Sequence, residues 1–235
     1  MAYELYYWPT LQGRGEFVRL ALEAAGADYV DVSRQDGGEA MTALMKEGAA
    51  PSFAPPFVRL GDRTVGQVAA ILAWLGPQLN LSPAGDSDRA GLNQIQLTFA
   101  DLVAEAHDTH HPVDLMAYYD DQKPEAARRA EGFRKERIAK FLGWAEQVLA
   151  RNPSGPTWLV GESLTYADLS LFQVVEGLIY AFPKAAARAL KTTPNVTALS
   201  DRVAALPRIR AYLHSPRRIP FNQDGIFRRY PELDG

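Results

Sequence analysis

The sequence predicts an α/β unit followed by an all-α unit, and three observations support this fold class. Residues 3–32 read as strand, helix and strand, the order of a βαβ unit with parallel strands. Residues 57–65 read as two short strands joined by Gly61-Asp62, a two-residue turn typical of antiparallel hairpins. From Arg89 onward strand signals almost vanish and helical periodicity dominates.

The opening βαβ unit is defined by aromatic, apolar and glycine positions. Residues 3–8 form an aromatic and apolar run closed by Pro9, which suits the end of a strand. A glycine-containing turn then leads into a helical apolar pattern, which Gly26 stops at a C-cap position. Residues 29–32 read as the second strand.

The rest of the α/β unit contains two further helices on either side of the hairpin. A short helix is predicted over 39–46, and a proline-rich passage ending in Pro55-Pro56 follows it. After the hairpin, a helix over 67–75 carries apolar residues on one face and ends at Gly76-Pro77.

The chain divides where small and turn-forming residues accumulate. We expect a first domain over 1–79, a linker over 80–88 and a helical domain with a C-terminal tail over 89–235. Thr165 and Asp168 have the spacing of a capping box, which predicts a helix beginning there. The expected helical segments cover residues 89–118, 124–151, 165–181, 184–191 and 195–213.

Composition excludes several classes of function. The formal charge of −3 is distributed without a basic stripe, so we expect no nucleic-acid partner. No apolar run approaches the ~20 residues that span a bilayer, and the N-terminus lacks signal-peptide features, so we expect a cytoplasmic protein without a membrane partner. The chain has no cysteine, so any sulfur chemistry must come from a ligand.

Several motifs occur in an order that is typical of one enzyme family. They are Tyr7-Trp8-Pro9, Gly13-Arg14 before a helix with Arg19, Pro56 with a hairpin before Gln67, Asp101-Leu102, and the capping box from Thr165 to Asp168. In this order they resemble the cytosolic glutathione transferases of the tyrosine-type classes (alpha, mu, pi and sigma). The resemblance implies a thioredoxin-like N-terminal domain, a C-terminal helical bundle and a homodimer.

The resemblance also implies the residues of a glutathione site. The catalytic residue would be Tyr7, whose phenol stays protonated at neutral pH and can donate to a sulfur anion. Gln67 and the backbone at Val68 would hold the γ-glutamyl end, and Asp101 would reach the ammonium group of a neighbouring subunit's glutathione. The complete set of implied glutathione-binding residues is Trp8, Arg14, Lys46, Pro55, Pro56, Gln67, Val68 and Asp101.

Two positions depart from the family pattern, and Tyr7 has a competitor for its role. Pro55 has no N–H to offer the cysteinyl part of glutathione, and Val68 stands where the family has a hydroxyl residue. Glutathione binding would then depend more on the backbone N–H groups at the start of a helix. Tyr6 lies on the opposite face of the strand from Tyr7, so only one of them can face the cleft.

Two other features have alternative interpretations. His107, His110 and His111 have helical spacing and could form a metal site, but Pro112 closes the helix there. We therefore expect no metal, and interpret the histidines as polar surface or cleft lining. The aromatic tail over 219–233 is expected to lie back over the protein or to cover the pocket of a second substrate.

The function predicted by the resemblance is the transfer of glutathione to a small, mostly apolar electrophile. Glutathione is then a substrate, and no other cofactor is expected. The alternatives are a binding or interaction protein with little activity, and a glutathione-dependent isomerase or peroxidase. The lack of cysteine argues against thiol-transfer reductases, which use a protein thiol.

Overall fold

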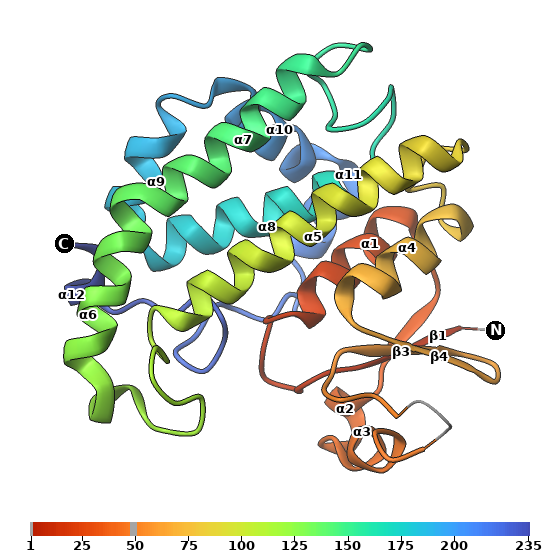
Figure 1. The fold of residues 1–235 in the computed structure, drawn as a ribbon. Coiled ribbons are helices and arrows are strands. Elements are labelled where there is room, and N and C mark those ends of the chain that lie inside the picture. The colour runs from red at the N-terminus through yellow and green to blue at the C-terminus, as the bar shows by residue number, and fades with distance from the viewer. Residues whose placement is uncertain (1, 48–50) are drawn as a thin grey trace.

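A computed structural model describes residues 2–47 and 51–235, and its N-terminal part is built on a four-stranded sheet (Figure 1). The strand order is β2-β1-β3-β4. Strand β1 (Tyr3–Tyr6) pairs in parallel with β2 (Tyr29–Asp31) and antiparallel with β3 (Phe57–Leu60), which forms a hairpin with β4 (Arg63–Gly66). The predicted βαβ unit and the predicted hairpin are confirmed.

Helices cover both faces of the sheet. Figure 1 shows α1 (Gly15–Ala25) and α4 (Val68–Gln78) on one face, and α2 (Ser33–Asp36) and α3 (Glu39–Leu44) on the other. Alternation along β1 explains this, because Leu5 packs with apolar residues of α1 and α4 while Tyr6 packs with Met41 of α3. This arrangement is the predicted thioredoxin-like unit.

The prediction that α4 ends at Gly76-Pro77 is wrong, because the helix continues to Gln78. Pro77 lies in the last turn, where it removes only its own backbone donor, and the N–H of Leu79 still donates to the Leu75 carbonyl at 2.9 Å. Gly76 serves close packing instead, since a Cβ there would lie 2.9 Å from the ring of Tyr166. The short helix α2 was not predicted.

From Asp86 onward every described element is a helix, as the sequence predicted. Helix α8 lies in the middle of this bundle, with most of its residues buried, and packs against α5, α10 and α1 (Figure 1). The bundle comprises α5 (Asp86–Asp108), α6 (Lys123–Gly132), α7 (Ile138–Arg151), α8 (Tyr166–Ala181), α9 (Pro183–Leu190), α10 (Pro194–Ala205), α11 (Pro207–Leu213) and α12 (Pro231–Asp234). A 3₁₀ turn, Tyr119–Gln122, precedes α6, and a π turn, Phe133–Arg137, joins α6 to α7.

Two predicted helices have different boundaries in the structure. The helix expected over 89–118 spans Asp86–Asp108, and the Thr109 hydroxyl donates to the Ala106 carbonyl at 2.6 Å where it ends. The segment expected over 195–213 is two helices, because Pro207 holds Leu206 in an extended conformation with ψ 130°. No helix within residues 2–47 and 51–235 is both long and apolar enough to cross a membrane.

The predicted capping box at the start of α8 is confirmed. Thr165 is the N-cap, and the Asp168 carboxylate accepts the Thr165 backbone N–H at 2.7 Å. The other carboxylate oxygen accepts the N–H of Leu159 at 2.8 Å, so the cap also holds the loop before the helix. Asp168 therefore has a structural role, as the spacing of the capping box indicated.

Candidate functional site

Tyr7 directly follows β1 and lies in a tight niche at the start of α1. Its side chain is only 5% exposed, and its hydroxyl oxygen accepts the backbone N–H of Arg14 at 2.9 Å. A Cβ added to Gly13 would lie 2.1 Å from the hydroxyl, and one added to Gly15 would lie 2.6 Å from the ring. The two glycines therefore allow the turn to wrap around the phenol.

The niche keeps the Tyr7 hydroxyl protonated. Burial raises the pKa of Tyr7, and the hydrogen bond from the Arg14 amide acts in the opposite direction without reversing the shift. Within residues 2–47 and 51–235, the one hydrogen bond found at this hydroxyl uses its oxygen as acceptor. The phenolic proton can therefore be donated to an anionic ligand atom.

Tyr6 does not share this environment. Its ring stacks on Phe57 with centroids 5.1 Å apart, and its hydroxyl donates to the Glu4 carboxylate at 2.9 Å. Burial and this carboxylate raise the pKa of Tyr6 to about 12. Of the two tyrosines, Tyr7 is thus the one beside the start of α1.

A buried arginine holds the loop that carries Arg14. The Arg19 side chain is fully buried and pairs with Asp31 at 2.7 Å and with Glu16 at 3.3 Å. Its Nη1 also donates to the backbone carbonyls of Leu11 at 3.2 Å and Gln12 at 3.3 Å. Arg19 Nη2 and Asp31 Oδ1 have no hydrogen-bond partner among the described residues. We interpret the bonds from Arg19 to the two carbonyls as fixing the loop conformation beside Tyr7.

A cavity of about 410 Å³ lies between α4 and α5, which is within the usual range for small-molecule sites. Arg14, Gln67 and Val68 line it together with mostly apolar residues of both helices. From α5, Gln96 also lines the cavity, and its buried Oε1 has no hydrogen-bond partner among the described residues. Such an atom is a natural acceptor for a ligand donor.

Gln67 has a strained backbone where the cavity meets the helix start. Its φ of 66° and ψ of 123° are rare for a residue with a side chain. Gln67 is the N-cap residue of α4 and Val68 is its first residue, so the unpaired N–H groups of the first turn begin there. Such a helix start favours an anionic group.

The structure brings together only part of the predicted site. The bond between Pro55 and Pro56 is cis, as predicted, and both prolines are buried. Pairing of Phe57 with Gly66 places Pro56 close to Gln67. Tyr7 joins the group through its bond to Arg14. The predicted residues that are exposed and do not line the cavity are Trp8, Lys46 and Asp101.

The C-terminal tail lies back over the protein beside this site. Asn222 donates to the Thr10 carbonyl at 2.9 Å, and Gln12 donates to the Ile219 carbonyl. Phe227 is buried where Gly177 leaves space, since a Cβ at Gly177 would lie 2.3 Å from the ring. The first of the two roles expected for the tail is thus confirmed.

Sequence reasoning missed several residues that shape the site. The wrapping of Gly13 and Gly15 around Tyr7 was not foreseen, although their spacing around Arg14 was a visible signal. Gln96 has no sequence signal, because it looks like any polar residue of a long helix. Its role depends on the packing of α4 against α5.

Comparisons with known proteins agree with this geometry. A family model described as "Glutathione S-transferase, C-terminal domain" matches residues 107–216. A glutathione S-transferase of Plasmodium falciparum is 26% identical over 217 residues, covering 89% of this chain and 93% of that protein. Glutathione S-transferase P 1 of Xenopus laevis is 26% identical, covering 92% and 93%. Over residues 107–216 the chain matches the C-terminal domain of the glutathione transferases, and the two relatives are similar to it over most of its length.

The fold also matches solved structures. A pi-class glutathione S-transferase of Onchocerca volvulus superposes with a TM-score of 0.73 at 20% identity, covering 96% of this chain and 99% of that one. The likeness extends over the sheet and the helical bundle alike. It supports the α/β plus all-α fold class for the whole chain.

Proposed function

We propose that this protein is a glutathione transferase in which Tyr7 activates the glutathione sulfur for attack on a small, mostly apolar electrophile. One observation carries the proposal. Tyr7 is a buried phenol whose oxygen accepts the Arg14 amide and whose proton is left for donation. Arg14 also lines the cavity that reaches the strained start of α4 at Gln67.

Each end of glutathione has a matching group in this arrangement. The γ-glutamyl carboxylate would bind at the helix start, beside Gln67 and the N–H of Val68. Arg14 would face a carboxylate or the thiolate as a fixed positive charge. These assignments rest on the convergence of the three side chains on one cavity.

The chemistry requires Tyr7 to favour the thiolate over the thiol. Lowering a thiol pKa from ~8.5 to ~6.5 needs ~2.7 kcal/mol of preferential stabilisation. One hydrogen bond to a charged acceptor contributes ~1.5–3 kcal/mol, so Tyr7 accounts for most of the shift. The thiolate then forms a C–S bond with the electrophile, which releases a leaving group or takes up a proton.

We place the electrophile between the Tyr7 loop and the helical part of the chain, with the tail as its cover. Phe221 and Phe227 of the tail lie with Gly13 around a gap of about 10 Å³, so they already cover this point and would have to move to admit the electrophile. Aromatic side chains suit an apolar partner. The electrophile itself is not identified by this chemistry.

We infer a homodimer, and the exposure of Asp101 on α5 supports this inference. Asp101 forms no ion pair with any residue in the described part of the chain, and across a two-fold interface it would meet the ammonium group of the partner's glutathione. We also propose a first domain over 1–79, a linker over 80–88 and a helical domain over 89–235. We further propose a cytoplasmic location and a role in detoxification. No nucleic-acid or membrane partner is proposed.

A binding protein with little activity is the second candidate, and Pro55 favours it. Pro55 is buried beside the site and has no N–H for the cysteinyl backbone of glutathione. Val68 likewise supplies no hydroxyl. A glutathione-dependent isomerase or peroxidase would use the same thiolate as the transferase.

Calorimetric titration with glutathione and a conjugation assay test the proposal. The wild-type protein should bind glutathione and conjugate a generic aromatic electrophile. Gln67→Ala should weaken binding, whereas Gln78→Ala, at the other end of the same helix, should not. No binding at millimolar glutathione would contradict the proposed function. Binding without turnover would favour the second candidate.

A further inference from the structure

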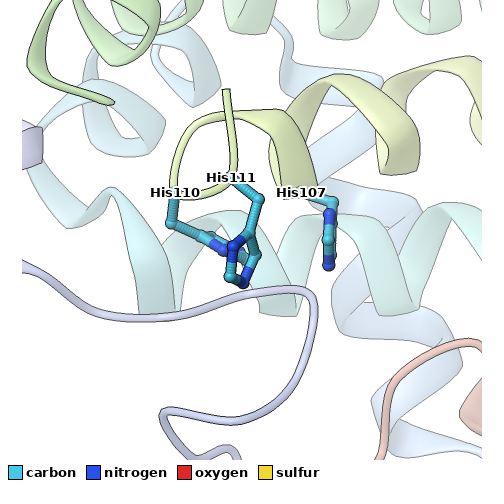
Figure 2. Close-up of side chains that lie close together, drawn as sticks. All are labelled: His107, His110 and His111. Carbon is cyan, nitrogen blue, oxygen red and sulfur yellow. The ribbon is translucent and has the colours of Figure 1, made fainter. Parts of the chain in front are cut away.

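Three histidine rings gather where α5 ends, and Figure 2 shows them projecting from one short stretch of chain. His107 lies in the last turn of α5, while His110 and His111 follow it. The backbone N–H groups of His110 and His111 donate to the His107 carbonyl at 3.2 and 3.3 Å, so helical spacing continues past the helix end. One ring nitrogen from each histidine lies within 4.8 Å of the others.

The hydrogen bonding of His110 determines which of its nitrogens is free. Its Nε2 lies 2.8 Å from the carbonyl oxygen of Ile226. A carbonyl only accepts, so Nε2 carries the proton and Nδ1 carries a lone pair. His110 is 1% exposed, and its Nδ1 has no partner in the part of the chain that the structure describes.

An unpartnered buried lone pair is costly unless a ligand uses it. Metal-binding histidines show this arrangement, since the nitrogen that does not bind the metal donates its proton to a carbonyl or carboxylate. The donation to Ile226 therefore fixes the orientation of the His110 ring and leaves the lone pair on Nδ1.

The other two rings differ in their protein partners, and the His111 ring is hydrogen-bonded to the Ala117 backbone carbonyl. Gln122 approaches His111 Nδ1 at 3.4 Å, but its amide protons are directed to the carbonyls of Asp114 at 2.9 Å and Ala117 at 3.2 Å. Among the described residues, none forms a side-chain hydrogen bond with His107. The rings of His107 and His111 stack with centroids 5.1 Å apart.

We propose that His107, His110 and His111 form a binding site for a divalent late transition-metal ion, Zn²⁺ foremost, with a fourth position open to an exogenous ligand. Imidazole nitrogen suits zinc rather than magnesium or calcium, which prefer oxygen. Zinc–nitrogen distances of about 2.0–2.1 Å require nitrogens about 3.4 Å apart in a tetrahedral site. Metal binding would therefore require the rings of His107 and His111 to move toward His110 from the present spacing.

Protons compete little for this site. Burial lowers the pKa of His107 to about 4 and that of His110 to about 2, and it lowers the pKa of His111 as well. All three rings are therefore neutral near pH 7, as metal ligands must be. The sequence favoured a polar surface or cleft lining for these residues, and the buried Nδ1 of His110 changes that interpretation.

The charges around the cluster determine the fourth ligand. The positive charge of Arg228 lowers the pKa of all three rings, and that of Arg14 lowers the pKa of His107. The negative charge of Asp114 raises the pKa of His111. A dication on three neutral ligands beside two arginines leaves excess positive charge. The open position should therefore take an anion, such as hydroxide, in preference to a neutral ligand.

Metal titration of the purified chain, stripped with a chelator and kept free of glutathione, tests this site. Co²⁺ should bind with a stoichiometry of one ion per chain and give the visible d–d bands of a four-coordinate ion, and Zn²⁺ should displace it. His107→Gln and His111→Gln should each weaken binding by at least about tenfold. His214→Gln is the matched control, because His214 is the remaining histidine of the chain and bonds to Arg210 outside the cluster.

The outcomes separate the metal site from a folding effect and from the glutathione site. Zn²⁺ should raise the thermal midpoint of the wild type and His214→Gln, but not that of His107→Gln, while circular dichroism confirms that each variant is folded. Absence of stoichiometric binding, or binding unchanged in both His107→Gln and His111→Gln, would overturn the proposal. Because glutathione is absent, these results do not depend on the proposed function.

Discussion

Replacing Tyr7 with phenylalanine removes one oxygen from the proposed reaction centre and leaves the ring in place. The ring still fills the space that Gly13 and Gly15 leave for it, so the turn should keep its shape. Two interactions are lost, namely the donation to the glutathione thiolate and the acceptance of the Arg14 N–H. The first concerns catalysis, and the second concerns stability.

The size of the catalytic loss follows from the hydrogen bond. If Tyr7 contributes ~1.5–3 kcal/mol to the thiolate and little to the thiol, the pKa of bound glutathione should rise by about one to two units in Tyr7→Phe. Turnover near pH 6.5 should then fall roughly tenfold to a hundredfold. Loss of the acceptor for the Arg14 N–H should also cost about 1–3 kcal/mol of unfolding free energy.

The assay is the pH dependence of kcat/KM with a generic aromatic electrophile, with glutathione affinity measured by calorimetry. The deficit of Tyr7→Phe should shrink as pH rises, because the thiol then ionises without help, and glutathione affinity should change little. Tyr6→Phe is the control, since Tyr6 donates to Glu4 on the other face. Full activity of Tyr7→Phe near about pH 6.5, or a deficit that is equal at every pH, would refute the assignment of Tyr7 as activator.

Four further predictions test the site and the fold. Val68→Ser should tighten glutathione binding by about 1 kcal/mol in calorimetry, and an unchanged affinity would separate this position from the γ-glutamyl group. Gly15→Ala should lower the unfolding free energy in urea by about 1–3 kcal/mol, because its Cβ would lie 2.6 Å from the Tyr7 ring. Gly91→Ala is the control and should not destabilise the protein, because a Cβ added at this helical position would have no atom within 4 Å. His110 is neutral in the fold, with its pKa lowered to about 2 by burial, whereas the unfolded chain takes up a proton below a pKa of ~6.5. Its contribution to stability should therefore fall by about 1.3 kcal/mol between about pH 7.5 and 5.5. In chelator, His110→Gln should show a correspondingly shallower pH dependence, and an identical slope would contradict the buried neutral ring. Light scattering should give the mass of a homodimer, and a monomer at micromolar concentration would remove the role proposed for Asp101.

The parts of the fold that the sequence predicted correctly are those with local signals. Gly26 adopts a left-handed conformation at the end of α1, with φ 67°. Gly61-Asp62 turns the hairpin, and Asp168 caps α8 by accepting the backbone N–H of Thr165, the N-cap residue. Each signal involves residues a few positions apart, whose interactions are possible before any distant segment is in place. Tyr7, Arg14, Gln67 and Val68 were predicted as site residues from motifs in a characteristic order, and their roles stay predictions.

Other features were decided by tertiary structure alone, because they depend on contacts between distant parts of the chain. Glu16 looks like an ordinary first-turn carboxylate, but it is fully buried and accepts the hydroxyl of Tyr212 at 2.7 Å. His110 looks like a surface histidine, but the Ile226 carbonyl, 116 positions away, orients its ring and leaves Nδ1 without a partner. The sequence determined which chemical groups are present and most of the local elements. Only the packing of the tail and helices against the Tyr7 loop decided which polar groups are buried, and burial without a partner is what makes a polar group available to a ligand.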